Sequence, residues 1–204
     1  MSILALNTAG IYNLLLALIT KYGYEAIFGL MVLESATVPV PSEVVLPIAG
    51  LLAAKGLMNI YLALIAATAG SILGMLVDYV IGYYIGKEVI YKHLGLFHFS
   101  KKSLDDFDRW FNNNAAASVF LSRMLPVVRT IVSFPAGFSK MNIKEFVAYS
   151  LAGAVIWDAV LISYGYYLLS SKSAEVVLGS IGVLAIVIYA LYKVTTKRLH
   201  KRGK

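Results

Sequence analysis

Residues 120–137 read FLSRMLPVVRTIVSFPAG, and this stretch decides how the rest of the chain is interpreted. Two arginines, Arg123 and Arg129, lie in an otherwise apolar run, with Pro126 between them and Pro135 beyond them. A guanidinium stays protonated at any ordinary pH, and placing one in hydrocarbon costs at least about 2.5–3.5 kcal/mol. Such a cost is tolerated where the charge faces a cavity, an acidic partner or an anionic ligand. The stretch therefore predicts an anion-binding segment.

The composition indicates an integral membrane protein. Of the 204 residues, 59% are hydrophobic and 14% are charged, with a mean hydropathy of +0.76. The apolar runs are continuous, which favours α-helices over alternating transmembrane strands. The chain has no cysteine, which excludes disulfides and thiolate metal sites. Its net charge of +7 comes from loops and the tail, which predicts contact with lipid headgroups and no nucleic-acid partner.

We expect an all-α fold with about four membrane-spanning helices, at about residues 24–36, 59–86, 141–170 and 175–194. An in-plane helix over residues 9–20 precedes them. No Lys or Arg precedes Lys21, so this first helix is not expected to be a cleaved signal peptide. Residues 87–114 predict a cytoplasmic amphipathic segment, and residues 193–204 form a basic cytoplasmic tail. The two tryptophans, Trp110 and Trp157, are expected at membrane interfaces.

Residues 37–56, TVPVPSEVVLPIAGLLAAKG, predict a re-entrant hairpin. Pro39, Pro41 and Pro47 each remove a backbone donor and disfavour a helical residue before them. The apolar run that ends at Lys55 is too short to cross about 30 Å of hydrocarbon. Non-helical backbone at that depth must be shielded by protein or must line a water-filled cavity.

Residues 115–138 have the same character and predict a second re-entrant hairpin, shaped by Pro126, Pro135 and Gly137. Two interrupted segments in corresponding halves of a chain indicate a transporter built from inverted repeats. With four spans, all Lys and Arg except Lys55, Lys172 and the two intramembrane arginines lie on one side. The positive-inside rule then places both termini in the cytoplasm of a multi-pass plasma-membrane protein. The two hairpins would enter the membrane from opposite faces.

Six ionisable groups fall at membrane depth: Glu34, Glu43, Asp78, Asp158, Arg123 and Arg129. Burial favours the neutral form of a carboxyl group and a nearby arginine favours the ionised form, so at least one of these acids is expected to accept a proton. Glu34 and Glu43 flank the first proline run and rank first for proton coupling. The alternative is a static ion-pair network. For Asp78 and Asp158, pairing with an arginine is an equally good interpretation.

A phosphate is the favoured ligand of Arg123 and Arg129, because a guanidinium suits bidentate contact with it. The alternative is that both side chains snorkel to the interface. Pro126 argues against snorkelling, since its missing donor frees the carbonyl of Ser122 and leaves the helix open where the charges converge. The three histidines lie in loops or the tail, so no metal and no cofactor is expected.

These residues resemble the DedA family of membrane proteins, also called the SNARE-associated or VTT-domain family. The resemblance covers about residues 20–170. In the first half it is carried by Glu34, Pro39-Val-Pro41-Ser42-Glu43, Pro47-x2-Gly50 and Gly70-Ser71-x2-Gly74. In the second half it is carried by Phe120-x2-Arg123-x2-Pro126-x2-Arg129-Thr130, Pro135-Ala136-Gly137, Met141 and Gly153-x3-Trp157. One departure is Met75, where many members carry Asp directly after Gly74; Asp78 lies one helical turn later.

The resemblance implies two opposed re-entrant hairpins and, in bacterial members, recycling of undecaprenyl phosphate that depends on the proton motive force. We therefore expect a transporter of a polyprenyl phosphate. Arg123 and Arg129 would bind the phosphate, while Glu34 and Glu43 exchange protons or reshape the arginine site.

The alternatives are a less selective phospholipid scramblase, a proton-coupled small-molecule transporter and a non-transporting assembly factor. A lipid phosphatase is not favoured, because no histidine lies in the membrane segments to serve as a base, so the protein is not expected to be an enzyme. The expected partners are membrane lipids and protons, and a homo-oligomer is kept as an alternative to a monomer.

Overall fold

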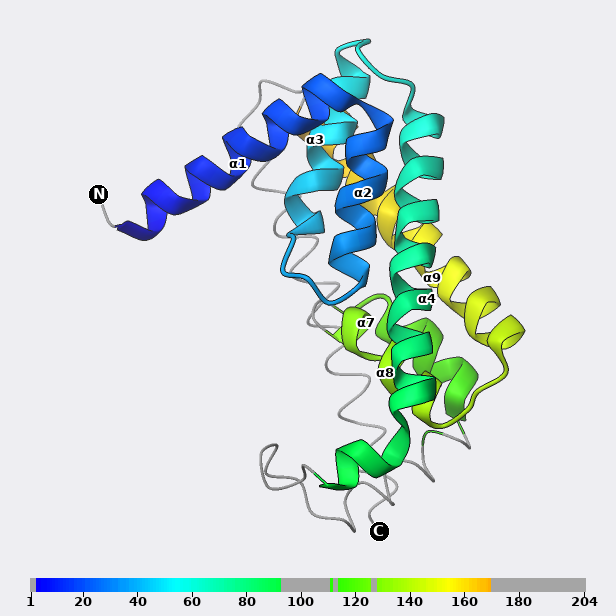
Figure 1. The fold of residues 1–204 in the computed structure, drawn as a ribbon. Coiled ribbons are helices and arrows are strands. Elements are labelled where there is room, and N and C mark those ends of the chain that lie inside the picture. The colour runs from blue at the N-terminus through cyan, green and yellow to red at the C-terminus, as the bar shows by residue number, and fades with distance from the viewer. Residues whose placement is uncertain (1–2, 93–110, 112–113, 126–127, 170–204) are drawn as a thin grey trace, which may run out of the picture.

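The computed structural model describes residues 3–92, 111, 114–125 and 128–169 (Figure 1). All regular elements in the described part of the chain are helices, and it contains no strand. Most of the expected amphipathic segment 87–114, the expected last span 175–194 and the tail 193–204 lie outside these residues. Pro126, between the two arginines, also lies outside them.

Two described helices are long and apolar enough to cross a membrane. The first is α4, Ile60–Lys92, with an apolar stretch over Ile60–Tyr84. The second is α9, Ile143–Tyr164, which continues into the π-helical segment η1, Gly165–Leu169. At 1.5 Å per residue, 25 apolar residues exceed the roughly 20 that a bilayer core requires. Both helices agree with the predicted spans at 59–86 and 141–170.

The prediction of a spanning helix at residues 24–36 is wrong. This segment forms α2, Tyr24–Ser35, whose 12 residues extend about 18 Å. The chain then turns back along α3, Ser42–Ala54, so that α2 and α3 form an antiparallel helical hairpin (Figure 1). The first hairpin is thus α2 and α3 together, rather than residues 37–56 alone. Because Lys21 precedes α2 and Lys55 follows α3, both lie at one end of the hairpin, and the charge count that placed both termini on one side loses its basis.

The helix before the hairpin, α1, spans Ile3–Tyr22 and is longer than predicted. Its C-terminal half packs Leu15 and Ile19 into an apolar core with α2 and α3. Its N-terminal half projects away from the other helices (Figure 1). Gly23 joins α1 to α2 at φ +60°, a conformation that residues with a Cβ rarely adopt.

Pro47 lies inside α3, where the sequence predicted an interruption. A proline there removes only the bond to the carbonyl of Glu43 four residues earlier. The loss is tolerated because α3 is buried from Val45 to Gly50 and packs against α9 and η1. The other two prolines, Pro39 and Pro41, lie where non-helical backbone was expected, in the connection before α3, and Pro41 is the N-cap residue.

The α2–α3 hairpin and the segment predicted as the second hairpin, residues 115–138, both pack on α4. α2 lies along its first half, and α8, Ser133–Phe138, lies along its second half (Figure 1). A Cβ on Gly74 would lie 2.8 Å from the Cβ of Ser35, and one on Gly82 would lie 2.6 Å from the carbonyl oxygen of Phe134. These glycines therefore permit the close helix contact that small-residue faces provide in membranes.

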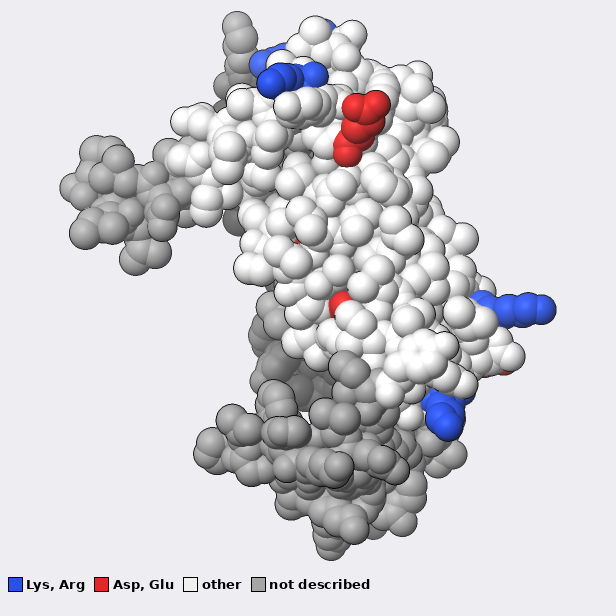
Figure 2. All heavy atoms as spheres, viewed as in Figure 1, with Lys and Arg blue, Asp and Glu red and all other residues white. Residues whose placement is uncertain are grey.

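Figure 2 shows the face of the molecule that is turned to the viewer in Figure 1. On this face the charged side chains lie mainly toward the two ends, and uncharged residues cover most of the middle. The outer surfaces of α2 and α4 carry large apolar side chains, such as Leu33 (46% exposed) and Leu73 (45% exposed). Exposed apolar surface of this kind suits contact with lipid.

A Met-Asn-Ile sequence precedes each of the two membrane-length helices. Met58-Asn59-Ile60 precedes α4, and Met141-Asn142-Ile143 precedes α9. Each asparagine caps its helix: the Asn59 side chain accepts from the N–H of Tyr61, and that of Asn142 from the N–H of Lys144, both at 2.9 Å. The two helices run in opposite directions (Figure 1).

Candidate functional site

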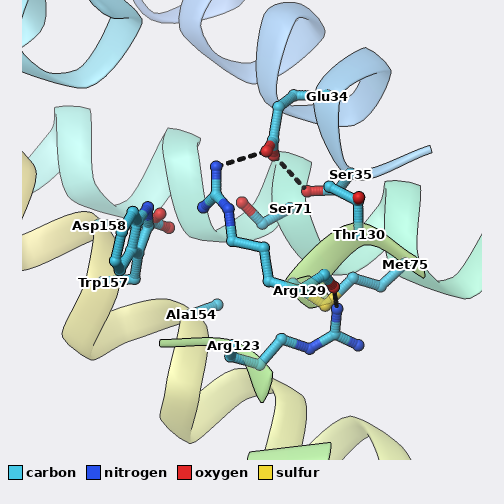
Figure 3. A pocket seen from close by; sticks show the side chains of 10 residues that line it. All are labelled: Glu34, Ser35, Ser71, Met75, Arg123, Arg129, Thr130, Ala154, Trp157 and Asp158. Atoms are coloured by element: carbon cyan, nitrogen blue, oxygen red, sulfur yellow. Dashed lines mark hydrogen bonds and ion pairs between the residues drawn. The ribbon is translucent and has the colours of Figure 1, made fainter. Parts of the chain in front are cut away.

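Arg129 lies where the two hairpins meet. It is carried by α7, Val128–Ile131, and its Nη2 donates to the carboxylate of Glu34 and to the hydroxyl of Ser42 (Figure 3). A carboxylate oxygen of Glu43 lies 3.7 Å from the same nitrogen. Arg129 and Glu34 are 8% and 5% exposed. They therefore form a buried ion pair between segments that are far apart in the sequence.

Arg123 is bound by neutral groups. Its Nη1 donates to the main-chain carbonyl of Arg129, and its Nη2 donates to the hydroxyls of Ser133 (3.1 Å) and Ser150 (3.0 Å). The guanidinium carbon lies 5.6 Å from the ring centroid of Phe146. No carboxylate in the described part of the chain pairs with Arg123, which is 2% exposed. Its charge is therefore buried without an anionic partner, the situation that an anionic ligand would relieve.

The position of Arg123 depends on Gly153 of α9. A Cβ at Gly153 would lie 2.6 Å from the Cβ of Arg123 and 3.2 Å from the carbonyl oxygen of Phe120. Real Cβ atoms do not approach other atoms as closely as the first of these distances. The absence of a side chain at Gly153 therefore allows the turn that carries Arg123 to pack directly against α9.

Asp78 and Asp158 accept hydroxyl hydrogen bonds, and neither forms an ion pair with an arginine within the described residues. Asp78 of α4 accepts from Thr37 at 2.5 Å, which joins α4 to the turn of the first hairpin. Asp158 of α9 accepts from Thr68 of α4 at 3.1 Å. The described residues contain no cluster of three or more carboxylates or histidines that could hold a metal.

Thr37 adopts an unusual backbone conformation. Its φ is +60°, as the residue after α2 requires when the N–H of Val38 donates back to the carbonyl of Leu33. Glycine is the usual residue there, and a β-branched residue is an outlier. The threonine is explained by its hydroxyl, which donates to Asp78.

A small pocket lies between the two hairpins, α4 and α9 (Figure 3). Its lining includes four of the six ionisable residues singled out in the sequence: Glu34, Arg123, Arg129 and Asp158. Glu43 and Asp78 do not line it. The cavity volume is about 10 Å³, about the space that one water molecule needs. A phosphate group is larger, so the pocket must open before an anion of this size can enter.

The residues expected to shape the second hairpin have different roles. Pro135 and Gly137 lie in α8, where a Cβ on Gly137 would lie 2.8 Å from the main-chain nitrogen of Tyr83. The carbonyl of Ser122, expected to be left open by Pro126, accepts from the N–H of Leu125 at 3.0 Å. The chain therefore closes into a hydrogen-bonded turn after residue 122.

Several site residues were not anticipated from the sequence. Trp157, expected at a membrane interface, is 8% exposed and lines the pocket. The guanidinium carbon of Arg129 lies 4.8 Å from its ring centroid, within the range of a cation–π interaction. The hydroxyls of Ser42, Ser133 and Ser150 hold the two arginines. A serine inside an apolar helix is the signal that could have indicated them.

Comparison with known proteins places these residues in a family. The VTT domain model matches residues 40–167. Undecaprenyl phosphate transporter A of Staphylococcus aureus (strain NCTC 8325 / PS 47) is 31% identical, covering 85% of this chain and 91% of that protein. An alkaline phosphatase-like protein of Lactococcus lactis subsp. lactis (strain IL1403) is also 31% identical, covering 87% and 91%.

Protein DedA of Escherichia coli (strain K12) is 27% identical, covering 91% of this chain and 88% of that protein. No solved structure matches the chain. The VTT match covers more than half of the chain and includes Glu43 and both arginines of the site. The chain therefore belongs to the VTT-domain family of membrane proteins, the DedA family.

Proposed function

We propose that this protein is a transporter that moves the headgroup of a polyprenyl phosphate across the membrane, with Arg129 as the principal phosphate ligand. The buried pair of Arg129 and Glu34 carries this proposal. Glu34 and Ser42 hold the guanidinium in place of a ligand, and both of these bonds use Nη2. Within the described residues no hydrogen bond engages its Nε or Nη1, and these donors would bind a phosphate, which suits the planar fork. The name of the S. aureus relative, undecaprenyl phosphate transporter A, supports a polyprenyl phosphate as the lipid.

The two hairpins are proposed to enter the membrane from opposite faces. α2 and α3, with 12 and 13 residues, are too short to cross about 30 Å of hydrocarbon. The Met-Asn-Ile sequence before each of the two oppositely directed helices supports a pseudo-symmetric arrangement of this kind. Contact between α2 and α7 then lies near the middle of the bilayer, where transporters built from inverted repeats hold their substrates.

The charge balance of the pocket supports coupling to protons. Its lining contains two arginines and two carboxylates, so its formal charge is zero. A phosphate monoester brings about −1.5 to −2 charges at pH 7, which would repel the carboxylates in a medium of low dielectric constant. Glu34 would take up a proton as phosphate replaces it on Arg129. The side chain of Glu43 is 46% exposed and lies 3.7 Å from Arg129, so it could pass that proton from water.

Arg123 would act mainly by placing Arg129. It donates to the carbonyl of Arg129 and to hydroxyls on α8 and α9. Its own charge adds positive potential to the pocket, which favours an anion. The two arginines therefore have different roles in the proposal: Arg129 exchanges partners and Arg123 stays fixed.

Native mass spectrometry of the purified protein tests the proposal through the lipids that co-purify with it. We expect a polyprenyl phosphate on the wild type and its loss from Arg129→Gln, while Lys140→Gln, which removes an exposed charge, retains it. Equal retention in Arg129→Gln contradicts the proposal. In liposomes, transport that requires a pH gradient supports the coupled transporter, whereas gradient-independent movement of zwitterionic lipids supports a scramblase.

A phosphatase is the second candidate, because the L. lactis relative is named alkaline phosphatase-like. The pocket lining offers hydroxyls on Ser35, Ser71 and Thr130, but its lining residues include no histidine or cysteine. Release of inorganic phosphate from a polyprenyl phosphate by the purified protein would support this candidate. Recovery of the intact lipid after prolonged incubation would exclude it.

A further inference from the structure

Two side chains of the pocket carry N–H donors that have no hydrogen-bond partner among the described residues. They are Nε of Arg123 and Nε1 of Trp157, which are 2% and 8% exposed. A buried donor without a partner loses its hydrogen bonds to water without replacement, and native proteins contain few of them. Both residues line the same pocket. A ligand that supplies acceptor oxygens would explain why these donors are kept.

The indole of Trp157 lies next to the guanidinium of Arg129. The distance from the guanidinium carbon to the ring centroid is 4.8 Å. Figure 3 shows the indole and Arg123 on different sides of the pocket, with the Arg129 side chain between them. A phosphate bound by Arg129 would therefore come within reach of the indole. The polar groups of Trp157 and Arg129 are all hydrogen-bond donors, which suits an anionic ligand.

We propose that Trp157 is a headgroup-binding residue whose indole N–H donates to an oxygen of the phosphate monoester that Arg129 binds. This inference rests on the proposed function, since it requires a phosphate ligand at Arg129. It adds a residue that the charge pattern did not indicate. It also gives the indole two roles: the ring face supports the guanidinium, and the N–H binds the ligand.

The alternative is that Trp157 only packs against Arg129. The variant Trp157→Phe separates the two, because phenylalanine keeps an aromatic ring beside the guanidinium and removes the N–H. Ser118→Ala is the matched control. The Ser118 hydroxyl is the third buried side-chain donor without a partner among the described residues, and it does not line the pocket.

The measurement is binding to the full chain in lipid nanodiscs, with undecaprenyl phosphate, undecaprenol and inorganic phosphate as separate probes. A hydrogen bond to a charged group contributes about 1.5–3 kcal/mol, so Trp157→Phe should weaken binding of undecaprenyl phosphate about 10- to 100-fold. Ser118→Ala should bind like the wild type, and undecaprenol should bind equally to all three. Inorganic phosphate could also bind the wild type and bind Trp157→Phe more weakly by the same factor. That result would support the donor role of the indole and would identify the ligand as a free phosphate ion rather than a lipid headgroup.

Thermal stability without ligand provides the second readout. Trp157→Phe removes an unsatisfied donor but also part of a buried ring, so its Tm should stay close to that of the wild type. A Tm that falls while binding is unchanged would show that Trp157 only packs, and would overturn the inference. Should Trp157→Phe fail to fold, β-(3-benzothienyl)alanine at position 157, which replaces the N–H by sulfur at nearly constant shape, gives the same comparison.

The outcomes also separate this inference from the proposed function. A wild type that binds no probe in an Arg129-dependent way refutes the proposed function. Binding that depends on Arg129 but is unchanged in both Trp157 variants refutes the role of the indole alone. Weaker binding in both variants, with a retained Tm, supports both.

Discussion

The guanidinium of Arg123 donates to the main-chain carbonyl of Arg129, so one arginine of the site fixes the position of the other. The remaining bonds of Arg123 go to hydroxyls of Ser133 and Ser150, whereas Arg129 binds Glu34 across the two hairpins. The two arginines appear equivalent in the sequence, but their environments in the structure differ. One arginine has neutral partners within its own half, and the other has an acidic partner that a ligand can replace.

Removal of either partner of the buried pair should destabilise the protein more than removal of both. Loss of one member of a buried ion pair leaves an uncompensated charge and costs about 3–5 kcal/mol. We therefore expect Arg129→Gln to lower the free energy of unfolding strongly, and the double variant with Glu34→Gln to recover part of that loss. A double-mutant cycle on denaturation in mild detergent measures the coupling. Strictly additive effects would show that the two side chains do not form the pair.

Thr37 should respond to substitution differently in stability and in transport. Glycine at this position relieves the cost of a left-handed backbone, about 1–2 kcal/mol, and loses the hydroxyl bond to Asp78. A hydrogen bond to a charged group contributes a similar amount, about 1.5–3 kcal/mol, so Thr37→Gly should leave thermal stability nearly unchanged. The rate of transport should fall, because the turn of the first hairpin is no longer tied to α4. The control is Lys140→Gly, at the other non-glycine residue with positive φ in the described chain (+54°). Lys140→Gly should gain stability without loss of transport. Equal transport rates in Lys140→Gly and Thr37→Gly would show that the hydroxyl of Thr37 is not needed for transport.

Gly153 should not tolerate a side chain. Because a Cβ there would lie 2.6 Å from the Cβ of Arg123, Gly153→Ala should destabilise the protein by about 1–3 kcal/mol through overpacking and weaken phosphate binding. Gly29→Ala is the matched control, since nothing lies within 4 Å of a Cβ at that position of α2. It should be neutral or stabilising by up to about 1 kcal/mol. Equal melting temperatures for the two variants would contradict the close contact between α9 and Arg123.

Glu43 should matter for coupling rather than for folding. Its side chain is 46% exposed, so Glu43→Gln is expected to change stability by no more than about 0.5 kcal/mol. Transport in liposomes under a pH gradient should nevertheless slow markedly, because the proposed proton path to Glu34 is lost. Asp158→Asn provides the comparison: it keeps an acceptor for Thr68 but removes a charge from the pocket. Wild-type rates in Glu43→Gln would exclude the proton path.

The sequence was sufficient for the all-helical class and for singling out the charged residues that the structure brings together at the candidate site. Uninterrupted apolar runs predicted α4 and α9 because length and composition alone decide whether a helix can cross a membrane. Arg123, Arg129 and Glu34 stood out because charge in such runs is costly. The repeated Met-Asn-Ile sequence was also present and could have indicated where α4 and α9 begin.

The remaining features depend on contacts between distant residues. Nothing local distinguishes α2 from the start of a spanning helix, since its return along α3 depends on the turn at Thr37 and on packing against Gly74. The serines that hold the arginines and the position of Trp157 depend on how α9 crosses α4. Pro47 was misinterpreted because its cost within a helix is offset by burial of α3, which no local rule expresses.

The central claim is that a phosphate replaces Glu34 on Arg129, and the affinity of Glu34→Gln for undecaprenyl phosphate tests it most directly. Without the competing carboxylate, and with like-charge repulsion relieved, the variant should bind the lipid about tenfold or more tightly than the wild type. Its transport should be slower, because release depends on the return of Glu34 to the guanidinium. The same substitution in an Arg129→Gln background should restore no binding. Weaker binding in Glu34→Gln than in the wild type would contradict the account.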